Sequence, residues 1–248
     1  MNTASKIALV TGATRGIGLE TVRQLAQAGV HTLLAGRDRA RAVEAALTLQ
    51  AQGLPVEAIA LDVTDAAGIA AAAAEVERRH GRLDILVNNA GIVIDDAARG
   101  VSAQSIETWR TTFETNVFGL VAVTQAFLPL LHRSRSGRIV NVSSALGSVT
   151  LHADPSSFLY DFKIPAYNVS KSAVNAWTVQ LAYELKDSAI KVNTIHPGYV
   201  RTEMNHVDGE QRGELDIPEG ARTSVRLALI GDDGPNGGFF YLDESLPW

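Results

Sequence analysis

The sequence places a tyrosine and a lysine four residues apart, at Tyr167 and Lys171, within the stretch AYNVSK. The residues that follow are typical of a helix, and side chains at this spacing lie on one helix face, with Cβ atoms about 5–6 Å apart. A free tyrosine has a pKa of about 10, which a nearby lysine cation lowers by favouring the phenolate. The pair therefore predicts a general acid/base, although the same spacing also occurs by chance on many helices.

Composition restricts the classes of protein to which the chain can belong. Its 248 residues, 46% of them hydrophobic, can bury one sizeable core and predict one α/β domain. A net charge of −5 without a basic stripe argues against nucleic acid and anionic membranes as partners. The absence of cysteine excludes disulfides and zinc-thiolate sites, and the six histidines lack helical metal-ligand spacing, so we expect no metal. The sequence starts without a secretory signal and has no apolar run of about 18 residues, so we expect a cytoplasmic protein.

Strands and helices are predicted to alternate along the whole chain. Apolar runs rich in β-formers predict strands at Lys6–Thr11, His31–Gly36, Pro55–Val63, Leu83–Gly91, Gly137–Ser144, Ile190–Gly198 and GGFFYLD. Helical patterns cover Ile17–Ala28, Arg37–Gln52, the alanine-rich segment after Asp65, Ala103–His132 with a break near Gly119, the Tyr167 segment and Pro218–Ile230. This order predicts one Rossmann-type domain over residues 1–248, a doubly wound parallel sheet of about seven strands with helices on both faces.

The glycine-rich stretch TGATRGIG directly follows the first predicted strand and opens the first helix. Gly12, Gly16 and Gly18 permit a tight turn and the close approach of a pyrophosphate. The helix N-terminus beyond them offers free N–H groups and a partial positive charge. The stretch therefore predicts a dinucleotide site, with an ordinary glycine-rich turn as the alternative. Asp62, at the end of the third strand, could bond an adenine or cap a turn.

The glycine spacing, NNAG at Asn88–Gly91 and the Tyr167/Lys171 pair, taken together and in order, resemble the short-chain dehydrogenase/reductase family over almost the whole chain. In HPGYVRTEM, the resemblance implies that Thr202 bonds the nicotinamide carboxamide, whereas His196 is expected in a loop or the core. The full cofactor set that it implies is Gly12, Thr14, Arg15, Gly16, Ile17, Gly18, Arg37, Asp62, Val63, Asn89, Ala90, Gly91, Tyr167, Lys171, Pro197, Gly198, Val200 and Thr202.

The end of the second strand predicts which nicotinamide cofactor is preferred. Family members that prefer NAD usually carry an acid there, but this chain has Gly36 followed by Arg37, with Arg15 inside the glycine loop. Two guanidinium groups without an intervening carboxylate suit a ribose phosphate. Asp38 is expected to begin the next helix, and we therefore expect NADP(H).

The same resemblance implies four catalytic residues, Asn116, Ser144, Tyr167 and Lys171. Ser143 and Ser144 compete for one role, and the family pattern of a small residue before the serine favours Ser144. Hydride from the nicotinamide would reach a carbonyl carbon while Ser144 and Tyr167 bond its oxygen, and Tyr167 gives the proton. Lys171 would hold the nicotinamide ribose, and Asn116 would kink the long helix and hold a water that relays protons.

Two loops hold the information about the substrate. Residues 145–165 form an insertion before Tyr167 that either builds an apolar wall over the site or packs as a surface loop, and the substrate loop at about 200–217 is short. The substrate contacts that we expect are Leu146, Phe158, Tyr199 and Met204, with Ile92 and Val93 as further candidates.

The pattern resembles carbonyl reductase-type members most, which implies a small to medium apolar aldehyde or ketone as the small-molecule partner, with reversible alcohol oxidation. An alcohol or hydroxysteroid-type dehydrogenase, a 3-oxoacyl reductase and a non-catalytic NADP-sensing protein are the alternatives. The sequence leaves open whether the chain is a monomer or a homo-oligomer (dimer or tetramer).

Overall fold

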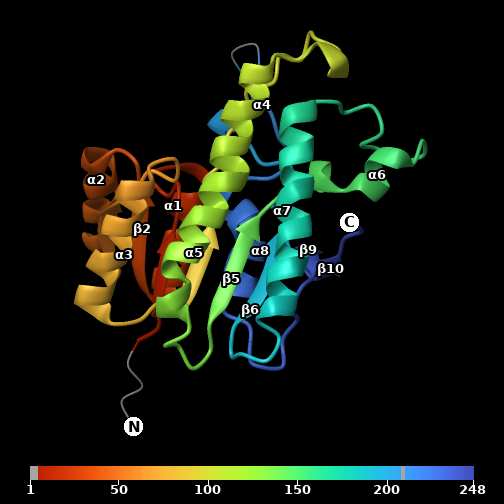
Figure 1. Ribbon diagram of the computed structural model, residues 1–248. Coiled ribbons are helices and arrows are strands. Elements are labelled where there is room, and N and C mark those ends of the chain that lie inside the picture. The colour runs from red at the N-terminus through yellow and green to blue at the C-terminus, as the bar shows by residue number, and fades with distance from the viewer. Residues whose placement is uncertain (1–4, 208–209) are drawn as a thin grey trace.

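A central eight-stranded sheet lies between two layers of helices in the computed structural model, which describes residues 5–207 and 210–248 (Figure 1). The strand order is β10-β9-β6-β5-β4-β1-β2-β3, and every neighbouring pair is parallel except β9 and β10. Its strands are β1 (Ile7–Val10), β2 (His31–Gly36), β3 (Val56–Ala60), β4 (Ile85–Asn88), β5 (Arg138–Val142), β6 (Lys191–Ile195), β9 (Phe239–Tyr241) and β10 (Glu244–Ser245). A separate hairpin pairs β7 (His206–Val207) with β8 (Glu210–Gln211).

Helices connect the strands and cover both faces of the sheet. The α-helices are α1 (Gly16–Gln27), α2 (Arg39–Gln50), α3 (Ala66–His80), α4 (Ile106–Phe113), α5 (Leu120–Leu131), α6 (Val149–Ala153), α7 (Pro165–Glu184) and α8 (Ile217–Ala228). Short 3-10 turns are η1 (Val101–Ala103), η3 (Ala145–Gly147) and η4 (Glu203–Asn205), and η2 (Glu114–Gly119) is a π-helix. The doubly wound parallel sheet expected from the sequence is confirmed, within a single layered unit (Figure 1).

The alternation of side chains along each strand divides the core into two clusters. In β1, Ile7 and Leu9 face the cluster under α3, α5 and α7, whereas Ala8 and Val10 face the cluster under α1, α2 and α8. Successive strand side chains point to opposite faces, so a strand covered on both sides must be apolar throughout. This is why the buried strands read as continuous hydrophobic runs.

Several predicted bounds differ from the structure. The strand expected at Pro55–Val63 is only Val56–Ala60, because the chain turns at Asp62. The long helix expected from Ala103 begins at Ile106, where Ser105 caps its N-terminus.

Three further features of the fold also depart from the prediction. The expected helix break near Gly119 is the π-helix η2 rather than an interruption. The segment 145–165, expected to be irregular, contains η3 and α6. The main sheet has eight strands rather than about seven, because the chain turns back after β9 to form the short antiparallel β10.

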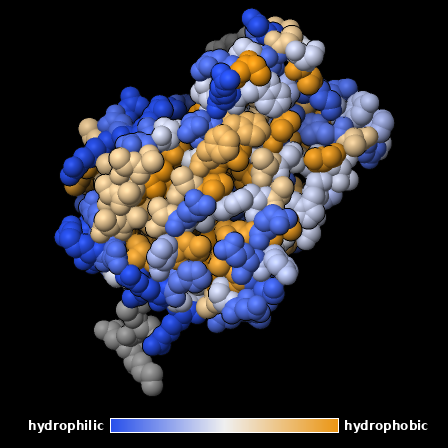
Figure 2. All heavy atoms as spheres, in the orientation of Figure 1, coloured by the Kyte–Doolittle hydropathy of each residue, from blue (hydrophilic) through white to orange (hydrophobic). Residues whose placement is uncertain are grey.

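Apolar side chains gather on the outer face of α5 and α7, near the middle of the view in Figure 2. Phe118, Val169 and Tyr183 are among the exposed large hydrophobic residues on these helices and on η2. The continuous stretch Ile106–Leu131 also has the length and apolar composition of a membrane span, but half of it is buried inside the fold, as in core helices of globular proteins. Its apolar character therefore carries no separate conclusion about membranes.

Candidate active site

The tyrosine and the lysine lie in the first two turns of α7, and both side chains are buried. The Lys171 Nζ donates a hydrogen bond to the Val142 carbonyl at the end of β5, with an Nζ–O distance of 2.8 Å. It lies 5.6 Å from the centroid of the Tyr167 ring. The strand end therefore holds the lysine at one side of the phenol ring, near the carboxyl edge of the parallel sheet.

Burial shifts the pKa of both groups. It raises the pKa of Tyr167 to about 12, even though a hydrogen bond with the Ser144 side chain acts in the opposite direction. It also lowers the pKa of Lys171 to about 8, because the buried cation loses its hydration. In the protein alone, loss of hydration therefore sets the Tyr167 pKa above its ordinary value, whereas the sequence led us to expect a lowered one.

The two adjacent serines at the end of β5 point to different partners. The Ser144 side chain hydrogen-bonds that of Tyr167 and also accepts the N–H of Leu146, with an O–N distance of 3.2 Å. The Ser143 hydroxyl instead donates to the backbone carbonyl of Lys171 at 3.2 Å. Of the two candidates, the structure therefore brings Ser144 to the phenol and places Ser143 against the helix backbone.

Asn116 lies in the π-helix η2, fully buried, where the wider turn directs its amide at the loop after β4. Its Oδ1 accepts the N–H of Ile92 at 2.8 Å. Its Nδ2 donates to the Ile92 carbonyl and to the Ser170 hydroxyl, both at 3.0 Å. A Cβ added at Gly91 would lie 3.4 Å from this Oδ1 and 3.5 Å from the Lys171 Nζ. Asn116 and Lys171 thus face the same glycine backbone.

A carboxylate from another part of the chain caps the helix that carries the tyrosine. The helix N-cap, Ile164, makes no side-chain cap. Asp95, in the loop after β4, instead accepts the N–H of Ala166 at 2.7 Å and that of Tyr167 at 3.1 Å. Asp95 is not among the site residues predicted from the sequence, because nothing in the local DDAARG pattern indicates that it reaches a helix 71 residues away.

The glycine loop and the NNAG loop are bonded to each other. The Thr11 hydroxyl accepts the N–H groups of Asn89 and Ala90, each at 3.0 Å, and the Asn89 amide donates to the carbonyls of Thr11 at 2.8 Å and Gly12 at 3.2 Å. Gly12 has a positive φ of 61°. A Cβ on Gly18 would lie 2.4 Å from the Asn89 Nδ2, so only glycine permits this approach. Beside this cradle, α1 begins at Gly16, and no described side chain caps its first N–H groups.

A side chain at position 36, at the end of β2, would require Thr14 to move. A Cβ on Gly36 would lie 2.4 Å from the Thr14 Cγ2. The Asp38 carboxylate accepts the Arg41 N–H and caps α2, as expected. Arg37 is exposed and makes no hydrogen bond or ion pair with the residues that the structure describes.

Arg15 and Asp62 have partners that the sequence did not reveal. Arg15 forms an ion pair with Glu203, which lies in η4 beyond β6. The Asp62 Oδ1 accepts the N–H and the hydroxyl of Thr64, at 3.0 and 2.8 Å. In this structure Asp62 therefore caps a turn, the second of the two interpretations left open by the sequence.

The loop after β6 is held in place by backbone contacts. Gly198 has a φ of 90° and packs against Leu215, and the buried Val200 forms a β-bridge with that same leucine. The Thr202 carbonyl accepts the Asn205 N–H at 3.1 Å. Residues 208–209 of the expected substrate loop lie outside the described chain. Nearby, burial lowers the pKa of His196 to about 4, so this ring is neutral at pH 7, as expected of a core histidine.

The expected substrate contacts differ in exposure. Phe158 is 77% exposed and Tyr199 and Met204 are each 47% exposed, whereas Leu159 is buried. Leu146 lies in η3, and its carbonyl is bonded to the His152 ring at 3.0 Å. The insertion packs through Leu159 and presents Phe158 to solvent, and an apolar wall over the site stays a prediction.

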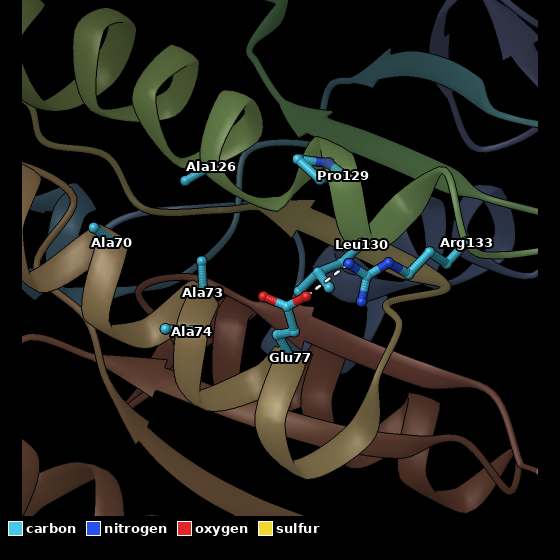
Figure 3. Close-up of a pocket in the computed structure, with 8 residues that line it drawn as sticks. All are labelled: Ala70, Ala73, Ala74, Glu77, Ala126, Pro129, Leu130 and Arg133. Atoms are coloured by element: carbon cyan, nitrogen blue, oxygen red, sulfur yellow. Dashed lines mark hydrogen bonds and ion pairs between the residues drawn. The ribbon is translucent and has the colours of Figure 1, made fainter.

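A shallow groove of about 320 Å³ lies between α3 and α5 and includes none of the expected site residues (Figure 3). It arises because small alanine side chains line both helices, and the ion pair between Arg133 and Glu77, with an N–O distance of 2.6 Å, crosses it at one end. We interpret this groove as a gap left by the packing of α3 against α5, and not as a binding site.

Comparison with known proteins agrees with this geometry. Residues 6–213 match the family model for short chain dehydrogenases. A short-chain dehydrogenase/reductase from Saponaria officinalis is 36% identical, aligned over 98% of this chain and 96% of its own. A (+)-neomenthol dehydrogenase from Capsicum annuum is 33% identical, over 98% and 97%.

Solved structures show the same likeness. Salutaridine reductase from Papaver somniferum superposes with a TM-score of 0.81 at 31% identity, covering 95% of this chain and 99% of that one. An NADPH-bound carbonyl reductase from chicken fatty liver has a TM-score of 0.83 at 28% identity, covering 98% and 94%.

Proposed function

Because the chain belongs to the short-chain dehydrogenase/reductase family, and is thus an oxidoreductase, we propose that it uses NADPH to reduce the carbonyl group of small to medium apolar aldehydes and ketones. The observation that carries this proposal is the buried Tyr167 hydroxyl, hydrogen-bonded to Ser144 and flanked by Lys171. The same groups would catalyse the reverse oxidation of an alcohol.

The residues around the glycine loop suit a nicotinamide dinucleotide. A pyrophosphate needs free N–H groups and a backbone that it can approach closely, and the uncapped start of α1 and the glycines at 12 and 18 supply both. A longer side chain at Gly91 would meet Asn116 and Lys171, so this glycine keeps space beside the lysine. We assign the NNAG loop and the residues from Pro197 to Thr202 to the nicotinamide half of the cofactor, as the family pattern implies.

The preference for NADPH rests on charge at the end of β2. Position 36 carries no carboxylate, and the exposed Arg37 guanidinium is available to bind a ribose phosphate bidentately. Arg15 would contribute a second guanidinium once it exchanges Glu203 for the phosphate. Arg15 and Arg41 line the same groove of about 400 Å³ between α1 and α2.

The chemistry follows from where charge develops. Bound NADPH would supply a hydride to the carbonyl carbon. The Tyr167 hydroxyl then donates its proton to the carbonyl oxygen, and the Ser144 hydroxyl hydrogen-bonds that oxygen as negative charge grows on it. With its pKa raised by burial to about 12, Tyr167 is protonated near pH 7, as the acid of the reductive direction must be. Lys171 stabilises the phenolate that remains, and Asn116 holds the loop beside it so that a proton can return from solvent.

The substrate class rests on the exposed apolar side chains of two loops and on the relatives. Phe158, Tyr199 and Met204 offer exposed apolar surface on the two loops after β5 and β6. The relatives include an isopiperitenone reductase from Mentha piperita and the neomenthol dehydrogenases. The alignment with the Capsicum annuum enzyme runs over 311 positions against 248 residues here, so that enzyme has segments that this chain lacks. We therefore propose a class of substrate for this chain and no particular compound.

The test is NADPH oxidation, followed at 340 nm, with a panel of aliphatic, cyclic and aromatic aldehydes and ketones, and the same panel with NADH. We expect turnover of apolar carbonyl compounds with NADPH and a lower kcat/KM with NADH. An enzyme that oxidises only alcohols, or that accepts only acyl thioesters, would contradict the substrate class. Cofactor binding without turnover of any compound in the panel would favour the sensor alternative.

A further inference from the structure

Two histidines and a glutamate converge at the end of the sheet opposite the proposed active site. His31 opens β2, Glu57 lies on the edge strand β3 and His80 is the last residue of α3. In the β2–β3 register Glu57 pairs with Leu33, two residues after His31, so both side chains project from the face that α3 covers. The fold thereby joins three residues that are separated by 26 and 23 positions in the sequence.

The donor atoms of this cluster are close and face one another. The His31 Nε2 lies 2.9 Å from the Glu57 Oε1, and the His80 Nε2 lies 3.7 Å from the Glu57 Oε2. One ligand atom from each residue can be chosen so that all three lie within 4.8 Å of one another. The two imidazole rings have centroids 5.3 Å apart and are tilted by 46°.

One nitrogen of each imidazole ring lacks a normal hydrogen-bond partner among the described residues. The Nε2 atoms of His31 and His80 are shielded from solvent, and neither makes a hydrogen bond of acceptable geometry within the described chain. The close approach of His31 to Glu57 is therefore a contact without a well-directed hydrogen bond. Buried polar atoms are rarely left unpaired, because losing water without a replacement is costly. A ligand that accepts both nitrogen lone pairs would resolve this.

We propose that His31, Glu57 and His80 form a zinc site, with a water molecule as the fourth ligand. Zinc binds imidazole nitrogen and carboxylate oxygen at about 2.0–2.2 Å, and its tetrahedral geometry suits three converging side chains. Two nitrogen ligands disfavour magnesium and calcium, which prefer oxygen. The cluster lies at the edge of the sheet, so the ion would tie the edge strand β3 to β2 and to the C-terminal end of α3.

Arg79 competes with the ion for the carboxylate. Its Nη2 forms an ion pair with the Glu57 Oε2, and its Nη1 binds the Glu75 Oε1 at 3.0 Å. The Glu57 Oε1 is the oxygen that faces His31, so it can bind a metal while the arginine keeps Glu75. This competition predicts moderate affinity, and it predicts that removing the guanidinium strengthens zinc binding.

The site is separate from the proposed catalytic centre. His31 and Gly36 lie at opposite ends of β2, about 17 Å apart at the usual rise of a strand. The zinc ion should therefore change stability and leave NADPH binding unchanged.

The test is a titration of chelator-treated full-length protein with Zn²⁺ at pH 7.5 by calorimetry, with Co²⁺ as a spectroscopic probe. We expect one equivalent of Zn²⁺ to bind, the visible absorption of tetrahedral Co²⁺ to appear, and the melting temperature to rise by about 5–10 °C at a Zn²⁺ concentration 100-fold above Kd. His31→Gln and His80→Gln should each weaken Zn²⁺ binding at least tenfold. Arg79→Gln should bind Zn²⁺ more tightly than the wild type.

The matched control is His132→Gln, an exposed histidine at the end of α5, which should bind Zn²⁺ as the wild type does. Circular dichroism and NADPH binding verify that each variant is folded. No saturable Zn²⁺ binding by the wild type would overturn the proposal. Equal weakening in Arg79→Gln and His80→Gln would also overturn it, because a general loss of structure would then explain both results.

Discussion

Asp95 should control the stability and position of the helix that carries the catalytic tyrosine. Its carboxylate accepts the backbone N–H groups of Ala166 and Tyr167, in the first turn of α7, where no local side chain caps the helix. Replacing Asp95 with alanine leaves both donors without a partner and removes a negative charge from the positive end of the helix macrodipole. The change should therefore act on folding and on catalysis together.

The loss of stability in Asp95→Ala follows from the two hydrogen bonds that the substitution removes. Losing an N-terminal cap typically costs about 1 kcal/mol, and a buried donor left unpaired costs about 1–3 kcal/mol. With two donors affected, we expect Asp95→Ala to lower the free energy of unfolding by about 2–4 kcal/mol. In a chain of this size the melting temperature should fall by about 5–12 °C. Because one of the donors is the N–H of Tyr167, a displacement of the phenol by about 1 Å should lower kcat up to about 100-fold.

The assay compares Asp95→Ala with Asp96→Ala. Asp96 is the neighbouring acid, and among the described residues its carboxylate accepts hydrogen bonds from the Ala98 N–H and the Arg99 side chain, both close to it in the chain. Both variants lose one negative charge, but only the first uncaps α7. We expect a large fall in kcat at nearly unchanged KM for NADPH in Asp95→Ala, and wild-type kcat with a melting temperature within a few degrees in Asp96→Ala. Equal melting temperatures and equal kcat values in the two variants would refute the reasoning.

Two further predictions concern the charges around the site. Arg37→Asp should lower the NADPH/NADH ratio of kcat/KM by at least tenfold, because it replaces the phosphate-binding cation with an anion, and an unchanged ratio would count against the assignment. Burial lowers the pKa of Lys171 to about 8 from an unfolded value of 10.5. Below pH 8 the buried lysine is protonated and destabilises the fold by about 3 kcal/mol. This destabilisation disappears as the pH rises from 8 towards 10.5, because the folded protein then loses the proton before the unfolded chain does. Denaturant unfolding of the cofactor-free protein should therefore show Lys171→Met to be more stable than the wild type at pH 7, with the difference shrinking by pH 10; a difference independent of pH would contradict this.

Local patterns in the sequence were enough to predict the sheet and much of the candidate site. The continuous apolar runs correctly indicated strands buried on both faces, and the glycine loop lies where its position after β1 predicted. The spacing of Tyr167 and Lys171 predicted that both lie on one helix, as they do. The family pattern favoured Ser144 over Ser143, and the structure brings the Ser144 side chain to the phenol. These predictions agree with the structure because each depends on a few consecutive residues.

Features that depend on contacts between distant segments could not be predicted from the sequence. Arg15 pairs with Glu203 across 188 positions, and Asp95 caps α7 from a loop whose pattern indicates only a turn. The pKa of Tyr167 depends on how completely the fold removes water from the phenol, and no spacing rule measures burial. A search for helical ligand spacing likewise could not find the histidine cluster, because its ligands come from two strands and a helix end.

The central claim is that the Tyr167 hydroxyl delivers the proton in NADPH-dependent carbonyl reduction. The most direct measurement is the rate of NADPH oxidation with the best carbonyl substrate from the panel, for the wild type and for Tyr167→Phe at equal cofactor saturation. The phenylalanine keeps the ring and removes only the hydroxyl that bonds Ser144. We predict NADPH binding within a few fold of the wild type and a fall in kcat of at least about 100-fold, in line with the loss of a general acid. A Tyr167→Phe variant that turns over at the wild-type rate would contradict the mechanism.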